Sequence, residues 1–191
     1  MLANFRPAVV LLLLFTVLTG LAYPLGMTAV AAIALADKAS GSMIRNGDRV
    51  IGSRLIGQQF QSDRYFWPRP SATAEVAYNA GASSGTNLGP TSAKLRDMVA
   101  AAVGHIRDAG VEGPIPADAV TASGSGLDPD ISPAFAQRQI ARVAKARGLD
   151  PDQVASLVDD QTELPWLGLF GEPRVNVLAL NIALDSFKPQ G

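Results

Sequence analysis

The hydrophobic and polar positions divide the chain into one long apolar segment and a mixed remainder. No residue from Pro7 to Ala36 carries a charge, and its central part, Val9 to Gly26, is rich in leucine. Spanning the hydrocarbon core of a bilayer takes about 20 helical residues. The pattern therefore predicts a transmembrane helix with its extension over residues 7–36, and Pro24 is a candidate position for a kink.

The same segment has a second interpretation, a cleaved signal peptide. The strings Ala29-Val30-Ala31 and Ala34-Leu35-Ala36 both resemble cleavage sites that follow an apolar run. However, the run is longer than a signal core of about 7–15 residues, and the basic region before it is reduced to Arg6. We therefore expect an anchor that stays attached.

Both interpretations give the same orientation. Residues 1–6 form a short tail that stays in the cytoplasm, and everything after the apolar run crosses the membrane. The charge bias is weak, because Lys38, Arg45 and Arg49 follow the run, but no second apolar run brings the chain back. We expect residues 37–191 to form one extracytoplasmic domain.

The pattern after the anchor predicts a domain with both strands and helices. The hairpin-type Asn46-Gly47 and the β-branched residues after it predict one or two short strands over 46–60. Two prolines favour an extended loop over 64–73, and 79–92 consists of loop-forming residues. The fold class we expect is α+β, a single N-terminal transmembrane helix followed by one mixed extracytoplasmic α/β domain.

Three helices are predicted from apolar spacing and end signals. The first runs from a cap at Thr91 or Ser92 to about Ala109, before Gly110. The second begins at Ser132-Pro133 and ends at Gly148, and the third begins at Asp150-Pro151. Their apolar positions are Leu95, Met98, Val99, Ala102, Val103 and Ile106 in the first; Ala136, Ile140, Val143 and Ala144 in the second; and Val154, Leu157 and Val158 in the third.

The last apolar stretch, 173–187, has two interpretations. Its start resembles a strand, and Leu178 to Asp185 fits a short helix better. Strand alternation also fits Val175, Val177 and Ala179.

Composition excludes several kinds of site. The chain has no cysteine and one histidine, His105, so disulfides, thiolate metal sites and His-rich metal sites are excluded. His105 lies beside the apolar face of its helix and is predicted to be a boundary or surface residue. A net charge of −1 gives no support for a nucleic-acid partner. Ser125 lacks the surroundings of a hydrolase nucleophile, and we identify no catalytic residue and no metal ligand.

A glycine- and serine-rich stretch is a candidate anion site. Ser123, Gly124, Ser125 and Gly126 could hold an anion with their N–H groups. A basic stripe on the following helix, predicted from the helical spacing of Arg138, Arg142 and Lys145, could help them. The chain contains no phosphate-loop string G-x-x-x-x-G-K-[ST], and such glycines more often only let a turn bend. We favour a turn and keep the four residues as candidates for anion binding.

Two further segments have functional and structural interpretations. Arg64, Trp67 and Arg69, among prolines, could form a rigid stacked ligand site, although such a cluster is more often a loop pinned by its aromatic residues. The loop 79–92 suits close backbone contact with another protein, or is a flexible surface loop.

Longer strings carry a family resemblance. They are GSRLIGQQF (52–60), YFWPRPSATAEVAYNAGASSGTNLGPT (65–91), VTASGSGLDPDISP (120–133), QIARVAKARGL (139–149) and GEPRVNVLALNIALD (171–185), with RPA (6–8) and YPL (23–25) before them. In order and nearly end to end, they resemble the KdpC family, the small subunit of the bacterial potassium-transporting Kdp P-type ATPase. Ser84, Thr86, Ser92 and Asp130 depart from residues that are common in that family.

The resemblance implies a non-catalytic, single-pass subunit of the inner membrane, surrounded by lipid. Its partners would be the channel-like potassium-translocating subunit KdpA, the P-type ATPase subunit KdpB and the small helical subunit KdpF. ATP and potassium would act at the level of the complex, and the resemblance favours the uncleaved anchor.

Two roles follow from the resemblance. In one, the subunit raises the ATP affinity of the pump, with Gln139 as a nucleotide contact beside the 123–126 stretch. A domain on the outer face cannot meet cytoplasmic ATP, so we favour the other, in which the domain stabilises and modulates the pump from outside. A membrane-anchored extracytoplasmic enzyme or solute-binding domain is the alternative from another class.

Overall fold

The computed structural model describes residues 4–187. The chain divides into two compact units, with the boundary between Met43 and Ile44. Residues 1–3 of the expected cytoplasmic tail, and the end of the expected domain after 187, lie outside the described residues.

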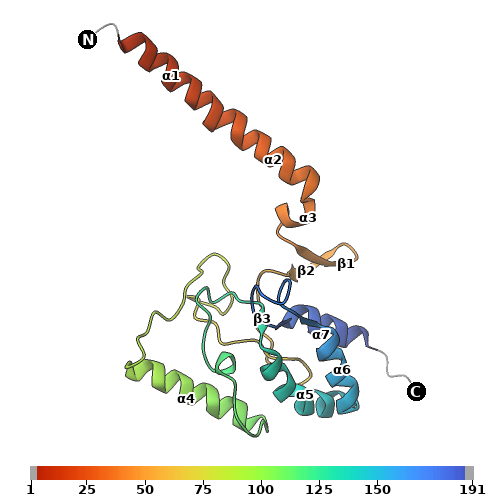
Figure 1. Cartoon of the computed structure of the whole chain (residues 1–191). Helices are drawn as coiled ribbons and strands as arrows, with labels where there is room; N and C mark the ends of the chain where they lie inside the picture. The colour runs from red at the N-terminus through yellow and green to blue at the C-terminus, as the bar shows by residue number, and fades with distance from the viewer. Residues whose placement is uncertain (1–3, 188–191) are drawn as a thin grey trace. The chain divides into compact units, whose positions relative to one another are not determined.

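The first unit consists mainly of one long apolar helix. It comprises α1 (Phe5–Val17), a π-helical turn (Leu18–Ala22) and α2 (Tyr23–Ala34), which follow one another in a continuous rod (Figure 1). Its 30 residues are the one stretch in the described part of the chain that is long and apolar enough to cross a membrane. At 1.5 Å per residue they extend about 45 Å, more than the roughly 30 Å of a hydrocarbon core. The short helix α3 (Ala36–Ala39) follows, so the apolar helix ends two residues before the expected Ala36.

The π-helical turn has a cause in the sequence. Pro24 has no N–H to donate to the carbonyl four residues earlier, and its ring crowds that carbonyl. The backbone adapts just before it, where the Tyr23 N–H donates to the Leu18 carbonyl five residues back. The predicted kink position is therefore a local change of helix type within a continuous helix.

A hairpin begins the strand-containing part of the chain. It pairs β1 (Met43–Asn46) with β2 (Arg49–Ser53), and Gly47 in the turn has a φ of 59°. The expected turn at Asn46-Gly47 is confirmed, and β2 lies within the predicted 46–60, whereas β1 begins before it, at Met43. The chain then runs from 54 to 92 without a helix or strand.

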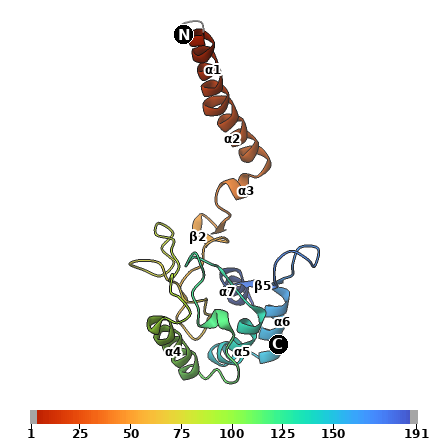
Figure 2. The same ribbon diagram turned by 60° about the vertical axis from the view of Figure 1, so that its left-hand side comes forward.

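Three helices, α5 (Pro133–Arg147), α6 (Pro151–Asp160) and α7 (Val177–Ser186), lie side by side in both views (Figures 1 and 2). The predicted starts of α5 and α6 are confirmed, because the side chains of Ser132 and Asp150 cap them. Gly148 ends α5 in the left-handed conformation, as expected.

A small antiparallel sheet joins these helices, in the order β3 (Asp130–Ile131), β5 (Arg174–Asn176) and β4 (Thr162–Glu163). Ile131 and Thr162 both lie opposite Val175. The strand and the short helix expected in 173–187 are confirmed, and continued strand alternation is wrong, because α7 begins at Val177. The two-residue strands β3 and β4 were not predicted, since so short a run has no periodicity.

The core of the second unit lies among α5, α6, α7 and the small sheet. Partly buried positions around it include Ile140 and Leu157, which were predicted at the apolar faces of their helices. Its buried members are Phe66, Ile106, Val111, Ala119, Ile131, Phe135, Ala136, Val143, Ala144, Val154, Val158, Val175, Val177, Leu180 and Leu184.

The helix α4 (Ala93–Asp108) has the predicted bounds but not the burial that its apolar stripe suggests. Ser92 caps it, and Gly110 follows with a φ of 80°. Of its apolar positions Ile106 alone is buried, and Met98 is 40% exposed. In Figure 1, α4 (green) lies apart from α5–α7, and most of its stripe is only half-buried. A short 3₁₀ helix, Ala117–Ala119, follows it.

Candidate functional site

The best-defined polar site is built around an irregular segment, Asp63–Trp67, whose last two residues are buried. Although it lies in the long stretch without helix or strand, its Phe66 is fully buried and Trp67 is 7% exposed. Backbone N–H and C=O groups buried in this way need hydrogen-bond partners. The prolines at 68 and 70 prevent the regular hydrogen-bond ladder of a β-sheet. The partners come from side chains of α5 and α7.

The amide side chains of Asn181 and Gln139 form hydrogen bonds to the backbone of two successive residues, Phe66 and Trp67. The Phe66 N–H donates to Asn181 Oδ1 (2.8 Å), and Asn181 Nδ2 donates to the Phe66 carbonyl (3.0 Å). The Trp67 N–H donates to Gln139 Oε1 (2.7 Å), and Gln139 Nε2 donates to the Trp67 carbonyl (3.1 Å). Each amide thus supplies the donor and the acceptor that a neighbouring strand would supply.

Two arginines hold the residues just before this pair. Arg142 donates through Nη1 to the Asp63 carbonyl (2.8 Å) and through Nη2 to the Tyr65 carbonyl (3.0 Å). Arg147 donates through Nε to the Arg64 carbonyl (2.7 Å). Every carbonyl from residue 63 to residue 67 therefore accepts a hydrogen bond from a side chain of α5 or α7. We call these four side chains the clamp: Gln139, Arg142, Arg147 and Asn181.

Aromatic stacking strengthens the clamp. The guanidinium carbon of Arg142 lies 3.8 Å from the centroid of the Trp67 ring, and His105 of α4 stacks on the same residue at 4.7 Å. Burial lowers the pKa of Arg142 to about 10, and the nearby Asp63 carboxylate partly opposes this shift. Arg142 therefore belongs to the interior, held by carbonyl oxygens and an aromatic face.

This placement corrects the predicted basic stripe on α5. Arg138 and Lys145 are exposed, but Arg142 is buried beneath Trp67, so the three do not form one solvent-facing row. The alternatives for Arg64, Trp67 and Arg69 are also resolved, because Trp67 is pinned in the interior and Arg64 is exposed. The segment is a loop fixed to the domain by its aromatic residues.

Gln139 has little capacity left for a ligand. Gln139 is only 1% exposed, so it lies in the interior. Its Oε1 accepts from the Trp67 N–H and also from Arg142 Nη2 (2.6 Å), while its Nε2 donates to the Trp67 carbonyl. The structure thus joins Gln139 to Trp67 and Arg142, whereas the 123–126 stretch bonds within itself and to Ser84.

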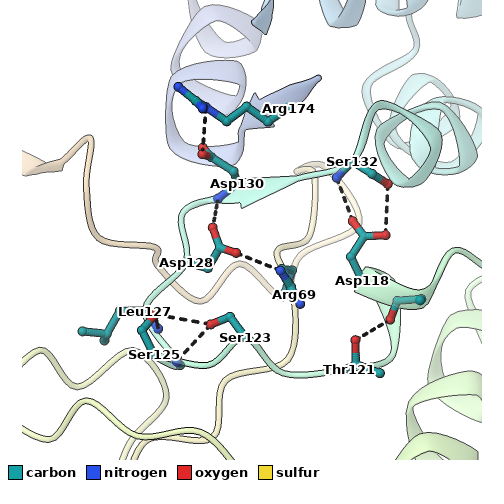
Figure 3. A network of polar contacts seen from close by, with 12 residues as sticks. Arg69, Asp118, Thr121, Ser123, Ser125, Leu127, Asp128, Asp130, Ser132 and Arg174 are labelled. Atoms are coloured by element: carbon teal, nitrogen blue, oxygen red, sulfur yellow. Dashed lines mark hydrogen bonds and ion pairs between the residues drawn. The ribbon is translucent and has the colours of Figure 1, made fainter. Parts of the chain in front are cut away.

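The 123–126 stretch is a turn packed against another loop. The N–H of Gly126 donates to Ser123 Oγ (2.9 Å), and the N–H of Leu127 donates to Ser125 Oγ (3.1 Å), as Figure 3 shows. The Ser125 carbonyl accepts from the Ser84 N–H (2.9 Å). The N–H groups of 126 and 127, which an anion would need, are occupied by the turn's own hydroxyl groups.

Beside this turn, charged groups are paired in a chain (Figure 3). Arg69 pairs with Asp128 at 2.8 Å, and Arg174 pairs with Asp130 at 3.2 Å. The other oxygen of Asp128 accepts from the Asp130 N–H (3.0 Å), and burial raises the pKa of Asp130. These contacts hold the chain from Asp128 to Asp130, where β3 begins.

A second polar contact in Figure 3 fixes the start of α5. Asp118 accepts from the N–H of Ser132 (2.7 Å) and from its hydroxyl group (3.0 Å). Within residues 4–187, no group of three or more His, Cys, Asp and Glu side chains is arranged to hold a metal ion.

A cavity of about 430 Å³ lies between the proline-rich segment and α4. Its polar lining is Gln59, Gln61, Arg69, Ser71, Tyr78 and His105; the Tyr78 hydroxyl donates to the Arg69 carbonyl, and burial raises the tyrosine pKa. Most of the lining is apolar, and Arg69 is already paired with Asp128. Its apolar lining includes Phe60, Trp67, Pro68, Pro70, Ala102, Ile106 and Phe135.

The clamp was not predicted, although the sequence carries a signal for it. Gln139 and Arg142 are in phase with Ala136 and Val143 on the buried face of α5, and Asn181 interrupts an apolar run. Polar side chains in phase with a core are hydrogen-bonded in most proteins. Their partner, an irregular segment more than 70 residues away, has no pattern that reveals the pairing.

These observations define a class of protein: a chain with a single apolar helix long enough to span a membrane and one mixed α/β unit organised around an internal clamp. Comparison with known families makes the assignment specific. The sequence model of a family described as "KdpC: K+-transporting ATPase, c chain" matches residues 5–186. The chain belongs to the KdpC family.

Curated relatives agree over nearly their whole length. A protein of Allorhizobium ampelinum is 57% identical over 186 residues, which covers 97% of both chains. A protein of Sorangium cellulosum is 57% identical over 187 residues, covering 97% of this chain and 98% of the relative. A protein of Paraburkholderia phytofirmans is 52% identical over 186 residues, covering 96% and 97%. Each is named "Potassium-transporting ATPase KdpC subunit".

Proposed function

We propose that the chain is a non-catalytic subunit of a potassium-transporting ATPase that stabilises the assembled pump and modulates its turnover. Membership of the KdpC family supports the potassium pump. The observation that favours a structural role over a nucleotide contact is the position of Gln139, whose amide is committed to Trp67 and Arg142. A subunit of this kind acts by binding one state of the pump better than another.

We further propose the topology. Residues 1–6 lie in the cytoplasm, 7–36 contain the span, and 37–191 form an extracytoplasmic domain at the inner membrane. Arg6 before the span supports this orientation. The family match begins at residue 5 and includes the apolar helix, which supports a retained anchor.

The partners in this proposal are the channel-like subunit KdpA, the ATPase subunit KdpB and the small helical subunit KdpF. A domain outside the membrane would contact the outer faces of these subunits. The partly exposed apolar stripe of α4 suits such contacts, because uncovered apolar surface of this kind marks interaction sites.

The competing proposal, a nucleotide contact at Gln139, has a structural cost. To bind ATP, Gln139 would release both the N–H and the carbonyl of Trp67, which would then be buried without partners. Each such loss costs about 1–3 kcal/mol. A solute-binding role would use the largely apolar cavity beside α4, and we favour it less because Arg69 on its wall is already paired.

The test uses the assembled pump with Gln139→Leu, and Gln137→Leu as its matched control. Gln137 is exposed on the same helix, whereas Gln139 is buried. We expect Gln139→Leu to lower the yield of co-purified pump several-fold and to leave the KM for ATP of the assembled fraction unchanged. The control should change neither.

A raised KM for ATP at normal yield of Gln139→Leu would overturn the structural role and support the nucleotide contact. ATP hydrolysis by the isolated full chain would overturn the non-catalytic assignment.

A further inference from the structure

The loop between β4 and β5 exposes an unusual concentration of large apolar side chains. Figure 2 shows this loop projecting away from the helices, between α6 and β5. We call residues 164–170 the apolar loop. The exposed fractions of its large side chains are 78% for Leu164, 70% for Trp166, 70% for Leu167, 80% for Leu169 and 63% for Phe170.

The apolar loop has a defined fold. The N–H of Trp166 donates to the Phe170 carbonyl (3.2 Å), and the N–H of Phe170 donates to the Trp166 carbonyl (3.1 Å). The two rings lie 5.8 Å apart, and Leu167 and Gly168 at the tip have φ values of 54° and 70°. The side chains are therefore held outward by a tight turn, and they do not fold back onto the domain.

The apolar loop exposes hydrophobic side chains along both of its arms and at its tip, and it contains no charged residue. A protein–protein interface usually combines an apolar centre with a polar rim on one face. A projection whose side chains are apolar throughout suits a medium that surrounds it, as lipid does. Tryptophan and other aromatic residues are enriched where membranes meet water.

The base of the apolar loop carries no excess of positive charge, because two carboxylates, Glu163 and Glu172, stand there with one guanidinium, Arg174. Glu163, just before it, pairs with Arg174 at 2.8 Å. The attraction to a membrane would thus be hydrophobic, without dependence on anionic lipid.

The membrane is also within reach. Residues 35–42, which include α3, connect the apolar helix to β1, and even a fully extended chain of that length covers at most about 30 Å. Whatever the arrangement of the two units, the second unit is held close to the bilayer that the helix spans. Such a tether gives a high effective concentration, so weak insertion suffices.

We propose that the apolar loop is a second membrane contact, which inserts its tip into the headgroup–acyl boundary of the bilayer that the helix spans. The ligand is the phospholipid surface itself. This inference rests on the proposed membrane span and adds a lipid contact that orients the domain beside the pump. Together, the helix and the apolar loop would fix the domain at two points.

The test uses the full-length chain, which has no cysteine, in phosphatidylcholine nanodiscs. Single cysteines replace Leu169 in the apolar loop, the exposed Ser156 on α6, and Leu14 in the apolar helix. Each carries an environment-sensitive fluorophore, which is quenched either by lipids with a nitroxide near the headgroup or by a water-soluble quencher. We expect the Leu169→Cys probe to be quenched several-fold more by the lipid than the Ser156→Cys probe, and to be shielded from water.

Equal quenching of the Leu169→Cys and Ser156→Cys probes by the water-soluble quencher would overturn the inference. The Leu14→Cys probe separates this failure from failure of the span, because it should be quenched by lipid whether or not the apolar loop inserts. In the assembled pump, a Leu169→Cys probe shielded from both quenchers would show that another subunit covers the loop, which would also overturn the inference.

Discussion

Arg142 combines several contacts that only a guanidinium group can make together. It donates to the carbonyls of Asp63 and Tyr65 while its plane lies against the Trp67 ring. A lysine ammonium keeps the charge but lacks the planar fork and the stacking surface. At the scale of single residues, the shape of the charged group is therefore as important as its sign.

We predict that Arg142→Lys lowers the free energy of unfolding of the full chain by about 1–3 kcal/mol, because a buried carbonyl loses its donor. Thermal unfolding in nanodiscs, followed by tryptophan fluorescence, measures the loss. Arg138→Lys is the matched control, since Arg138 is exposed one turn earlier on α5 and should change little. Equal stability of the two variants would contradict the clamp.

At the scale of elements, the domain depends on loops that pack against each other. The turn at 123–126 fits against the 79–92 loop so closely that a Cβ added at Gly126 would lie 2.6 Å from the Ser84 carbonyl oxygen. Gly126 also has a φ of 67°, where side chains are strained. The two loops thus form one packed layer. This packing helps to hold the long stretch 54–92 in place, although it contains no helix or strand.

We predict that Gly126→Ala destabilises the full chain by roughly 2–4 kcal/mol, from backbone strain and overpacking. Gly124→Ala is the control, because a Cβ added at Gly124 meets nothing within 4 Å. Urea unfolding of both variants measures the difference. Equal stability of Gly126→Ala and Gly124→Ala would contradict the close packing of the two loops.

The elements also show what the sequence could predict. The helices α4, α5 and α6 were placed correctly because Ser92, Ser132 and Asp150 cap them by local hydrogen bonds. The burial of Phe66 and Trp67 depends on amide groups of α5 and α7 far along the chain. Local signals define helix ends, whereas contacts between distant irregular segments leave no periodic trace, and so the clamp was missed.

At the scale of the whole molecule, the proposals depend on which side of the membrane the second unit lies. A structural clamp, an outer-face contact with the pump and a membrane-inserting loop are all compatible with an extracytoplasmic domain. A nucleotide contact at Gln139 requires the opposite side, because ATP is cytoplasmic.

The most direct measurement is thiol labelling of the assembled pump in intact cells, with Ser156→Cys and Glu112→Cys as two separate exposed positions in this cysteine-free chain. If the domain lies outside, as we propose, a membrane-impermeant reagent should label at least one of them without permeabilisation. Labelling of both positions only after permeabilisation would place the domain in the cytoplasm. That result would contradict the proposed topology and leave the ATP contact at Gln139 as the better account.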